Sequence, residues 1–393
     1  MKKDNLKRLI SVASGKIKAD LVIRNGKIVD VYTGRIIEAD LALCGGLIAG
    51  IGAYEGVAVI DAEGLYVLPG FIDSHIHIES SFLRPSELGR LLVPHGTTAI
   101  IADPHEIVNV CGRAGLEFMM NDAENTALDI KFMLPSCVPA TPFEHSGASL
   151  DAAAMEQPIQ DKRILGLGEM MNYPGVIGAE SEVLDKLILA INSGKLIDGH
   201  GPGVAGRDLD ACAAGAIHTD HECATREEME DRLSRGMYVM LRQGSACKDL
   251  RNLIPALTPQ NSRHCLLCSD DLQPSSVFEQ GHIDNDLRIC VDEGVDPVTA
   301  IQMATLNAAE CYRLYDRGGI APGLRADLVL VNNLKDFAVR QVFIGGIPAA
   351  GDGQYVLPVS HSDDKAVRGS FQVKDFSAEK LALPLSKDEV YVI

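Results

Sequence analysis

The chain has 393 residues, of which 46% are hydrophobic and 23% are charged, and this balance is that of a folded globular protein. A formal net charge of −18, from 36 Lys and Arg against 54 Asp and Glu residues, disfavours a nucleic acid as partner because a polyanion would be repelled. Ten scattered cysteines fit a reducing compartment, and neither a signal peptide nor a membrane-spanning stretch is recognisable, so we expect a soluble, cytoplasmic protein with no membrane partner.

Residues 1–68 predict a short helix followed by β-structure. Apolar residues recur at helical spacing near the N-terminus, at Leu6, Leu9, Ile10 and Ala13. Short β-forming runs broken by Gly and Asn then predict a module of hairpins, with a turn at Asn25–Gly26. The predicted strands are Leu21–Arg24, Lys27–Val31, Leu41–Leu43, Leu47–Ile51 and Val57–Asp61.

Residues 69–316 repeat a pattern of strand, loop and helix. Helical stretches such as Glu180–Asn192, Arg226–Arg235 and Asp284–Glu293 separate the predicted strands. Eight strands that alternate with helices predict parallel βαβ units closed into a (β/α)₈ barrel of the TIM type. These strands are Phe71–Glu79, Thr97–Asp103, Ile130–Ser136, Ile164–Met170, Leu196–His200, Ala216–His221, Tyr238–Arg242 and Cys265–Asp270.

Residues 317–360 return to β-structure, at Asp327–Asn332 and Gln341–Ile344 before a Gly345–Gly346 turn. Together with residues 1–68 they predict a small β-sandwich formed from both chain ends. Within residues 361–393, a polar stretch is followed by a new apolar alternation at Phe371, Val373 and Phe376. Apolar residues recur at 390–393. We expect this segment to be the start of an apparently truncated C-terminal domain; in the alternative, residues 390–393 dock on the sandwich as an edge strand.

The strongest local signal is the pair His75 and His77 on the first strand of the predicted barrel. Side chains on a strand alternate faces, so both imidazoles share one face, which we expect to include Glu79. Two imidazoles at positions i and i+2 can chelate one divalent ion. The alternative is a pair of core histidines with satisfied hydrogen bonds, although barrel interiors are normally filled by Val, Ile and Leu.

Further candidates follow at the ends of later strands, where this fold places catalytic groups. His200, His221 and Asp270 end the fifth, sixth and eighth strands, and together with the first pair they supply enough donors for two metal ions. Glu169 ends the fourth strand in an apolar, Gly-flanked run. A buried carboxylate there could bridge two cations or could simply pair with a histidine.

Three polar residues close the second strand, namely Asp103, His105 and Glu106. They could hold the nitrogen edge of a substrate ring, or they could form an ordinary charged loop. The segment from Arg242 to Ser245, after the seventh strand, is better explained as a structural turn. Cys265 and Cys268 should lie on opposite faces of a strand, so they should not share a metal.

Taken together, these motifs resemble those of the amidohydrolase superfamily and, more closely, of the adenine deaminases. The Pro104-His-Glu and Gly168-Glu-Met-Met segments are typical of that family within the superfamily. The resemblance covers nearly the whole chain and includes Leu68–Ser81, Ala102–Ile107, Pro135–Pro142, Gly166–Gly175, Asp198–Gly203, Asp220–Cys223, Ser269–Asp271, Gly281–Asp284 and Met303–Glu310.

The resemblance implies a binuclear centre of Mn²⁺ or Fe²⁺, with Zn²⁺ as the alternative. It assigns His75 and His77 to one metal ion, His200 and His221 to the other, and Glu169 to the bridge between them. Asp270 would complete the site and shuttle protons while water attacks C6 of adenine, giving hypoxanthine and ammonia. The second-rank candidates for gripping the purine are Asp103, His105, Glu106 and Asp271.

The resemblance leaves two competing interpretations and one expectation about assembly. Another amidohydrolase reaction, such as opening a cyclic amide or cleaving an N-acyl amino acid, would use the same His75, His77 and Asp270. A non-catalytic scaffold that kept the barrel should show broken ligands, whereas every expected ligand is present here. We further expect a homo-oligomer, most simply a dimer.

Overall fold

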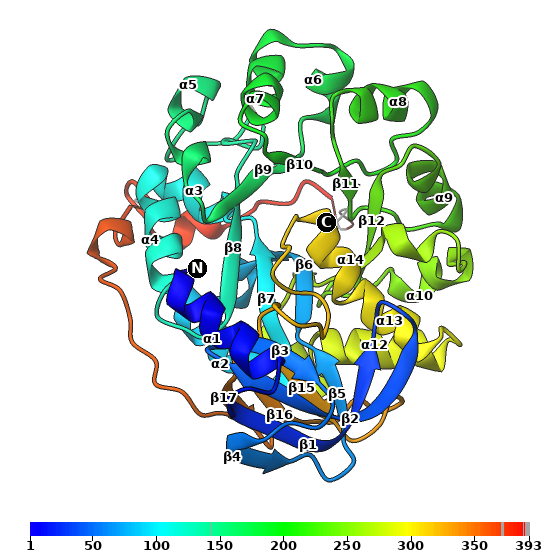
Figure 1. Ribbon diagram of the computed structural model, residues 1–393. Coiled ribbons are helices and arrows are strands. Elements are labelled where there is room, and N and C mark those ends of the chain that lie inside the picture. Colours follow the sequence, from blue (N-terminus) through cyan, green and yellow to red (C-terminus); the bar gives the residue numbers. More distant parts are fainter. Residues whose placement is uncertain (142, 371–372, 388, 390–393) are drawn as a thin grey trace.

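The computed structural model describes residues 1–141, 143–370, 373–387 and 389 (Figure 1). Strands from both ends of the chain form one sheet at the bottom of the view, and the helices surround the central, parallel strands above it. Among the described residues, no helix combines the length and apolar character needed to cross a membrane.

The sheet formed by strands from both chain ends has nine strands in the described part of the chain. Their order is β18-β17-β16-β15-β5-β1-β2-β3, with β4 paired to β1. Its two halves meet where β5 runs antiparallel to β15 and Val67 lies opposite Leu330. The two predicted β regions therefore join in one sheet. The strands are β1 (Ala19–Asp30), β2 (Arg35–Cys44), β3 (Leu47–Ile51), β4 (Gly56–Asp61), β5 (Tyr66–Pro69), β15 (Leu328–Val331), β16 (Val339–Ile344), β17 (Ile347–Gly351) and β18 (Gln354–Tyr355).

The predicted turn at Asn25–Gly26 is wrong. β1 continues through this dipeptide, and only its pairing register with β2 shifts there, which is the mark of a β-bulge. Asn25 takes the left-handed conformation with φ 56°, and a Cβ at position 26 would lie 2.8 Å from Val67 Cγ2. The dipeptide that often makes a tight turn is used here to bend one long strand against its neighbours.

The central strands run parallel and are buried on both faces. One sheet has the order β10-β9-β8-β7-β6-β14 and a second has the order β11-β12-β13, with Ser269 alone separating β13 from β14. This is a TIM-like fold. The strands are β6 (Phe71–His77), β7 (Thr97–Ala102), β8 (Asp129–Leu134), β9 (Ile164–Met170), β10 (Leu196–Gly199), β11 (Thr219–Asp220), β12 (Tyr238–Arg242), β13 (Cys265–Cys268) and β14 (Asp270–Asp271).

Helices follow the strands and cover their outer side (Figure 1). α1 precedes the sheet and buries Leu9 and Val12. The helices are α1 (Lys3–Ala13), α2 (Pro85–Leu92), α3 (His105–Cys111), α4 (Arg113–Ala123), α5 (Ala152–Met155), α6 (Tyr173–Ile177), α7 (Ser181–Asn192), α8 (Gly206–Ala214), α9 (Arg226–Ser234), α10 (Leu250–Leu253), α11 (Pro274–Gln280), α12 (Ile283–Asp292), α13 (Pro297–Met303) and α14 (Leu306–Cys311).

The segment after β18 runs along one side of the molecule, drawn in orange to red in Figure 1. The Ser362 N–H donates to Asp122 Oδ1 (2.9 Å) and Arg84 Nη2 donates to the Ser362 carbonyl (2.7 Å), which fixes the segment to α2 and α4. Val373 and Phe376, two residues of the apolar alternation noted in this segment, are exposed and lie outside any strand. Phe371 and residues 390–393 lie outside the described residues.

Candidate metal centre

The structure brings together the side chains of six residues that come from the ends of five parallel strands. β6 carries two imidazoles, β9 one carboxylate, the loops after β10 and β11 one imidazole each, and β14 a second carboxylate. Their nitrogen and oxygen atoms form overlapping groups in which all atoms lie within 4.8 Å of one another. The six residues are His75, His77, Glu169, His200, His221 and Asp270.

The first half of the cluster is formed by His75, His77 and Asp270. The two Nε2 atoms face each other at 3.1 Å, and Asp270 Oδ1 lies 3.0 Å from His77 Nε2 and 3.6 Å from His75 Nε2. His77 Nδ1 donates to the Asp103 carbonyl at 2.9 Å, which directs its Nε2 into the cluster. In a metal-binding histidine, the ring nitrogen that does not bind the metal typically donates a hydrogen bond to a carbonyl or carboxylate, as Nδ1 does here.

Glu169 lies at the centre of the cluster, and its two oxygens face different histidines. Oε2 is 3.0 Å from both His200 Nδ1 and His221 Nε2, whereas Oε1 is 3.3 Å from His105 Nδ1 and 3.8 Å from His77 Nε2. The backbone is held on both sides, because Glu169 N donates to Asp103 Oδ2 (2.8 Å) and Ser136 Oγ donates to the Glu169 carbonyl (2.5 Å). The carboxylate therefore has a fixed position between the two groups of imidazoles.

Burial and mutual charge shift the pKa values in this cluster strongly. Burial alone would raise the pKa of Glu169, but hydrogen bonds with His200 and His221 outweigh it and hold that pKa well below its usual range. Burial would likewise lower the pKa of His221, yet the hydrogen bond and charge of Glu169 raise it to about 9. Because an imidazole must lose its proton to bind a metal, a cation would have to displace the proton on His221.

The cluster is of a kind that could hold divalent cations. Its donors are imidazole nitrogens and carboxylate oxygens, the set that suits first-row divalent metals. The carboxylates are buried, and burying such charges together is costly unless cations are present to offset it. Cys265 and Cys268 pack into different hydrophobic clusters, which agrees with the expectation that their side chains lie on opposite faces of the strand.

Asp103, His105 and Glu106 lie beside the cluster, at the end of β7 and in the first turn of α3. Within the described ranges, Asp103 Oδ1, His105 Nδ1 and Glu106 Oε2 are buried and accept or donate no hydrogen bond. Burial and the charge of Glu169 raise the pKa of Asp103 well above its usual value. Asp271 is different, because it is exposed and accepts from Ser80 Oγ at the rim.

The expectation that Glu79 shares a strand face with the two histidines is wrong. β6 ends at His77, and Glu79 lies in a 3₁₀ turn (Ile78–Ser81), where Oε1 accepts from the Ile107 N–H at 3.1 Å. Burial together with the charge of Glu106 raises the pKa of Glu79 to about 8. This carboxyl group therefore secures the start of α3 and does not join the six donors.

Sequence reasoning missed Arg242 and Glu222. Arg242 to Ser245 does enter a turn, in which Gly244 N donates to the Cys247 carbonyl (2.8 Å). The Arg242 side chain, however, is buried, and its Nη1 donates to Asp270 Oδ2 (2.9 Å) and to Glu222. Their positions along the sequence could have revealed them, because Arg242 is the last residue of β12 and Glu222 directly follows His221, and both therefore lie at the carboxyl ends of strands.

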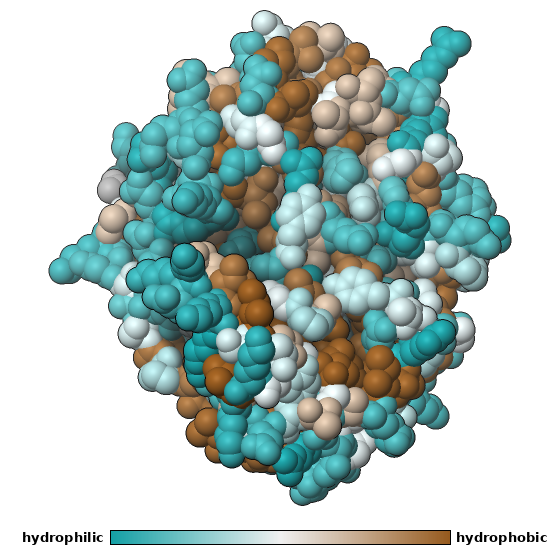
Figure 2. Space-filling view, in the orientation of Figure 1, coloured by the Kyte–Doolittle hydropathy of each residue, from teal (hydrophilic) through white to brown (hydrophobic). Residues whose placement is uncertain are grey.

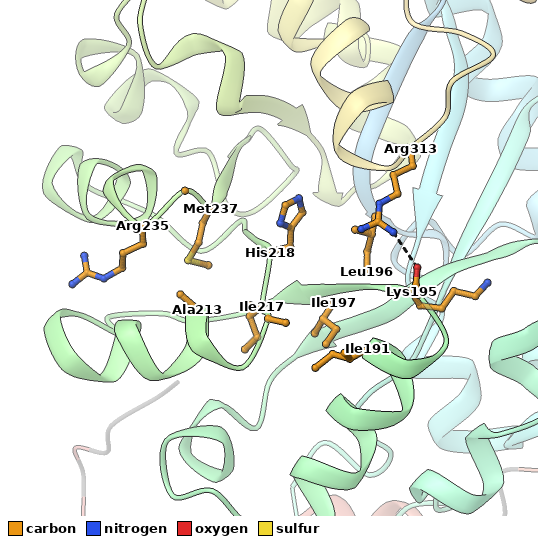
Figure 3. Close-up of a pocket in the computed structure, with 13 residues that line it drawn as sticks. Ile191, Lys195, Leu196, Ile197, Ala213, Ile217, His218, Arg235, Met237 and Arg313 are labelled. Carbon is orange, nitrogen blue, oxygen red and sulfur yellow. Dashed lines mark hydrogen bonds between the residues drawn. The ribbon is translucent and has the colours of Figure 1, made fainter.

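A separate cavity of about 370 Å³ lies at the opposite ends of the strands (Figure 3). It is bordered by residues at or just before the starts of β10, β11 and β12, including Leu196, His218 and Met237. In this fold, catalytic groups come from the carboxyl ends of strands, where the six donors lie. The cavity therefore lies at the end of the strands away from the candidate metal centre.

Comparison with known proteins agrees with this geometry. The model of the amidohydrolase family matches residues 66–348. The chain is 57% identical over 393 residues to adenine deaminase 2 of Desulfotalea psychrophila, which covers 100% of this chain and 68% of that protein. It is 53% identical over 380 residues to the adenine deaminase of Nitratidesulfovibrio vulgaris strain Hildenborough, covering 97% and 66%. The chain belongs to the adenine deaminase family of amidohydrolases.

The chain thus spans about two thirds of the length of the adenine deaminases it matches. Among solved structures, the β-aspartyl dipeptidase of Fervidobacterium islandicum AW-1 superposes with a TM-score of 0.63 at 19% identity, covering 86% of this chain and 98% of that one. At that identity the likeness concerns the fold, and it supports a TIM-like architecture for this member of the adenine deaminase family.

Proposed function

We propose that the protein catalyses the hydrolytic deamination of adenine to hypoxanthine and ammonia. The observation that carries the proposal is the 57% identity to an adenine deaminase along the whole chain. The geometry supports it, because a reaction that adds water to an aromatic ring carbon needs an activated water and a nearby proton carrier. The six convergent donors and Asp270 supply residues for both needs.

We assign His75, His77 and Asp270 to one metal ion and His200 and His221 to the other, with Glu169 bridging them. Glu169 Oε2 lies 3.0 Å from His200 Nδ1 and His221 Nε2 and 3.6 Å from His75 Nε2, so the carboxylate reaches histidines of both groups, which supports this bridging role. Mn²⁺ or Fe²⁺ is the metal that we propose, with Zn²⁺ as the alternative. When bound, these ions would lower the pKa of water and so provide a nucleophile at neutral pH.

Asp270 is suited to move the protons of the reaction. Arg242 occupies Oδ2, so Oδ1 is the oxygen that faces His75 and His77. In our proposal Asp270 takes a proton from the attacking water and delivers it toward a purine nitrogen or the leaving ammonia. Arg242 keeps the carboxylate turned toward the site during that transfer.

We propose that Asp103, His105 and Glu106 grip the purine. Each has a buried polar atom with no hydrogen-bond partner in the described part of the chain, and the edge of adenine carries both donors and acceptors. Protonated Asp103 could donate to a ring nitrogen, consistent with its raised pKa. Asp271 is a weaker candidate because it lies exposed at the rim.

We further propose that the parallel strands form a closed (β/α)₈ barrel. A hydrogen bond from His218 N to the Ile197 carbonyl (2.9 Å) supports closure between β10 and β11, and β14 pairs with β6. We propose domain limits at residues 1–68, 69–316, 317–360 and 361–393, with the first and third segments forming the small β-sandwich. A cytoplasmic location is part of the same proposal.

A homodimer is the assembly that we propose. Figure 2 shows apolar side chains gathered at the top of the view, where Figure 1 places α6 and α7. Leu184, Ile188 and Ile191 are exposed on α7 at spacings of four and three residues, so they lie on one face of the helix. Sedimentation equilibrium of the purified protein measures the assembly directly, and a monomer at all concentrations would refute the dimer.

A direct assay tests the proposed activity. Purified protein loaded with Mn²⁺ is given adenine, and ammonia release is measured alongside the absorbance change to hypoxanthine. We expect turnover of adenine and hardly any of adenosine, whose ribose would not fit a compact site. Comparable turnover of the two, or hydrolysis of a cyclic amide with none of adenine, would contradict the proposal. An Asp270→Asn variant serves as the inactive control.

A further inference from the structure

Asp73 is a buried carboxylate that the proposed chemistry does not use. It lies on β6 two residues before His75 and is fully buried. Its Oδ1 accepts from the N–H groups of His75 (3.2 Å) and Ser269 (3.1 Å), and its Oδ2 accepts from Ser269 Oγ (2.5 Å). A buried carboxylate with this many donors is fixed in place, and two of these donors belong to the residue that precedes Asp270.

Asp270 needs such a support because its backbone is strained. Its φ is 59°, in the left-handed region that residues other than glycine seldom occupy. This conformation turns the chain between β13 and β14 and points the carboxylate toward His77. A backbone conformation of this kind persists only where surrounding contacts hold it.

His282 completes the support from a distant part of the chain. It immediately precedes α12 and is buried, and its Nε2 donates to Asp73 Oδ2 at 2.9 Å. Its Nδ1 lies 2.7 Å from Thr97 Oγ1, so the ring is held at both nitrogens. His282 therefore binds the same oxygen of Asp73, Oδ2, that accepts the hydrogen bond from the Ser269 hydroxyl.

We propose that Asp73 and His282 are positioning residues for Asp270. The chain of contacts runs from Thr97 through His282 and Asp73 to Ser269, and it holds the peptide that places Asp270 in its left-handed conformation. Neither residue touches the substrate in this scheme. Their effect on the reaction, which rests on the proposed function, passes chiefly through the placement of the Asp270 carboxylate, because Ser269 gives two hydrogen bonds to Asp73 and His75 gives one from its backbone.

The test replaces the donor on residue 282 while keeping a side chain of similar size. His282→Leu removes the hydrogen bond to Asp73, whereas His282→Gln keeps an N–H that can reach it. Because small misplacements of a catalytic group can cost up to about a hundredfold in rate, we expect His282→Leu to lower kcat for adenine about tenfold to a hundredfold. KM and bound metal should stay near those of the parent, and His282→Gln should recover most of kcat.

Ser269→Ala provides a second, gentler change in case His282→Leu does not fold. It removes only the hydroxyl that donates to Asp73, so we expect a smaller loss of kcat with KM unchanged. His218→Leu is the matched control, since His218 borders the cavity at the other end of the strands. That variant should keep the kcat of the parent.

A readout independent of turnover separates this inference from the proposed function. Hydrogen exchange across residues 265–272 should be faster in His282→Leu and in Ser269→Ala than in the parent, and unchanged in His218→Leu. If the parent fails to deaminate adenine, the proposed function fails while exchange still reports on the positioning. Unchanged kcat and exchange in both variants would overturn the inference, as would a loss in His282→Leu that His282→Gln does not recover.

Discussion

The two ends of the parallel strands are built from different kinds of residue. At the carboxyl ends, histidines and carboxylates are buried side by side, and Asp270 keeps a strained backbone. At the amino ends, the cavity of Figure 3 is bordered by apolar side chains such as Ile197 and Ile217. Of the cationic side chains at its border, Arg235 pairs with Asp210 and Asp231, and Arg313 donates to the Gly194 carbonyl at 3.0 Å. The same strands thus carry costly polar groups at one end and ordinary packing at the other.

This contrast indicates which changes should affect activity and which should affect only stability. A group at the carboxyl ends contributes through charge and position, so even an isosteric replacement there should reduce the rate. A group at the amino ends contributes through burial, so its loss should lower the free energy of unfolding and leave the chemistry intact. Four experiments test the contrast, in order of decreasing effect on activity.

Removal of metal should have the largest effect. Dialysis against a chelator is expected to abolish ammonia release, and added Mn²⁺ or Fe²⁺ should restore it. The midpoint of thermal unfolding should fall as well, because a ligand present at a hundred times its Kd stabilises the native state by about 2.7 kcal/mol. Full activity in a preparation shown by elemental analysis to contain no metal would contradict a metal centre.

Glu169→Gln should come next. A neutral amide bridges two cations poorly. Loss of a residue that only supports a metal ligand commonly costs about 10–100-fold in affinity or activity, so for a ligand itself we expect kcat to fall about a hundredfold or more. Metal content measured on the same sample shows whether binding or chemistry was lost. Glu182→Gln, an exposed position on α7, is the matched control and should retain full activity. Full activity in Glu169→Gln would contradict the proposed role of Glu169 in the metal centre.

Arg242→Met should reduce activity less severely while also destabilising the fold. Arg242 is buried between Asp270, Glu222 and Asp249, and removing one partner of a buried ion pair costs about 3–5 kcal/mol. We expect kcat to fall about tenfold because Asp270 Oδ2 loses its donor. Steady-state kinetics and urea unfolding on the same variant measure the two effects. Unchanged kinetics would show that Arg242 serves only the fold.

Ile217→Ala tests the other end of the strands. Ile217 is buried beside the cavity, and truncation of such a side chain typically costs about 2–5 kcal/mol. Because the cavity already exists, we expect a cost near the lower limit, measured by urea unfolding. The kcat of the metal-loaded enzyme at 25 °C should be unchanged. A fall in kcat comparable to that of Arg242→Met would break the contrast between the two ends.

The sequence predicted the regular parts of this molecule well. The bounds predicted for Ile164–Met170 and Tyr238–Arg242 are those of β9 and β12, and both segments are predominantly apolar runs. The grouping of the histidines and Asp270 followed from one topological rule, that parallel strands end on the same side, whereas the assignment of Glu169 rested more on the family resemblance. Periodicity and topology were therefore enough to place side chains far apart in the chain close together in space.

The errors have identifiable physical causes. Asn25–Gly26 satisfies the local preferences of a turn, and only the length of β2 on the other side decides that β1 continues through it. Glu79 left the strand face because β6 ends at His77 and a 3₁₀ turn follows. Arg242 acts through Glu222, Asp249 and Asp270, which lie on separate segments, so no spacing along the chain reveals their contact.

The junction between β5 and β15 has a consequence for how the protein is made. Tyr66 pairs with Val331, so the central parallel strands β6 to β14 are synthesised between the two halves of one sheet. At about 5–20 residues per second, a ribosome needs on the order of tens of seconds to pass from β5 to β15. During that interval the nascent chain carries β5 as an open edge, the kind of strand that pairs readily with other chains. The growing polypeptide is thus exposed to misassembly until β15 emerges from the exit tunnel.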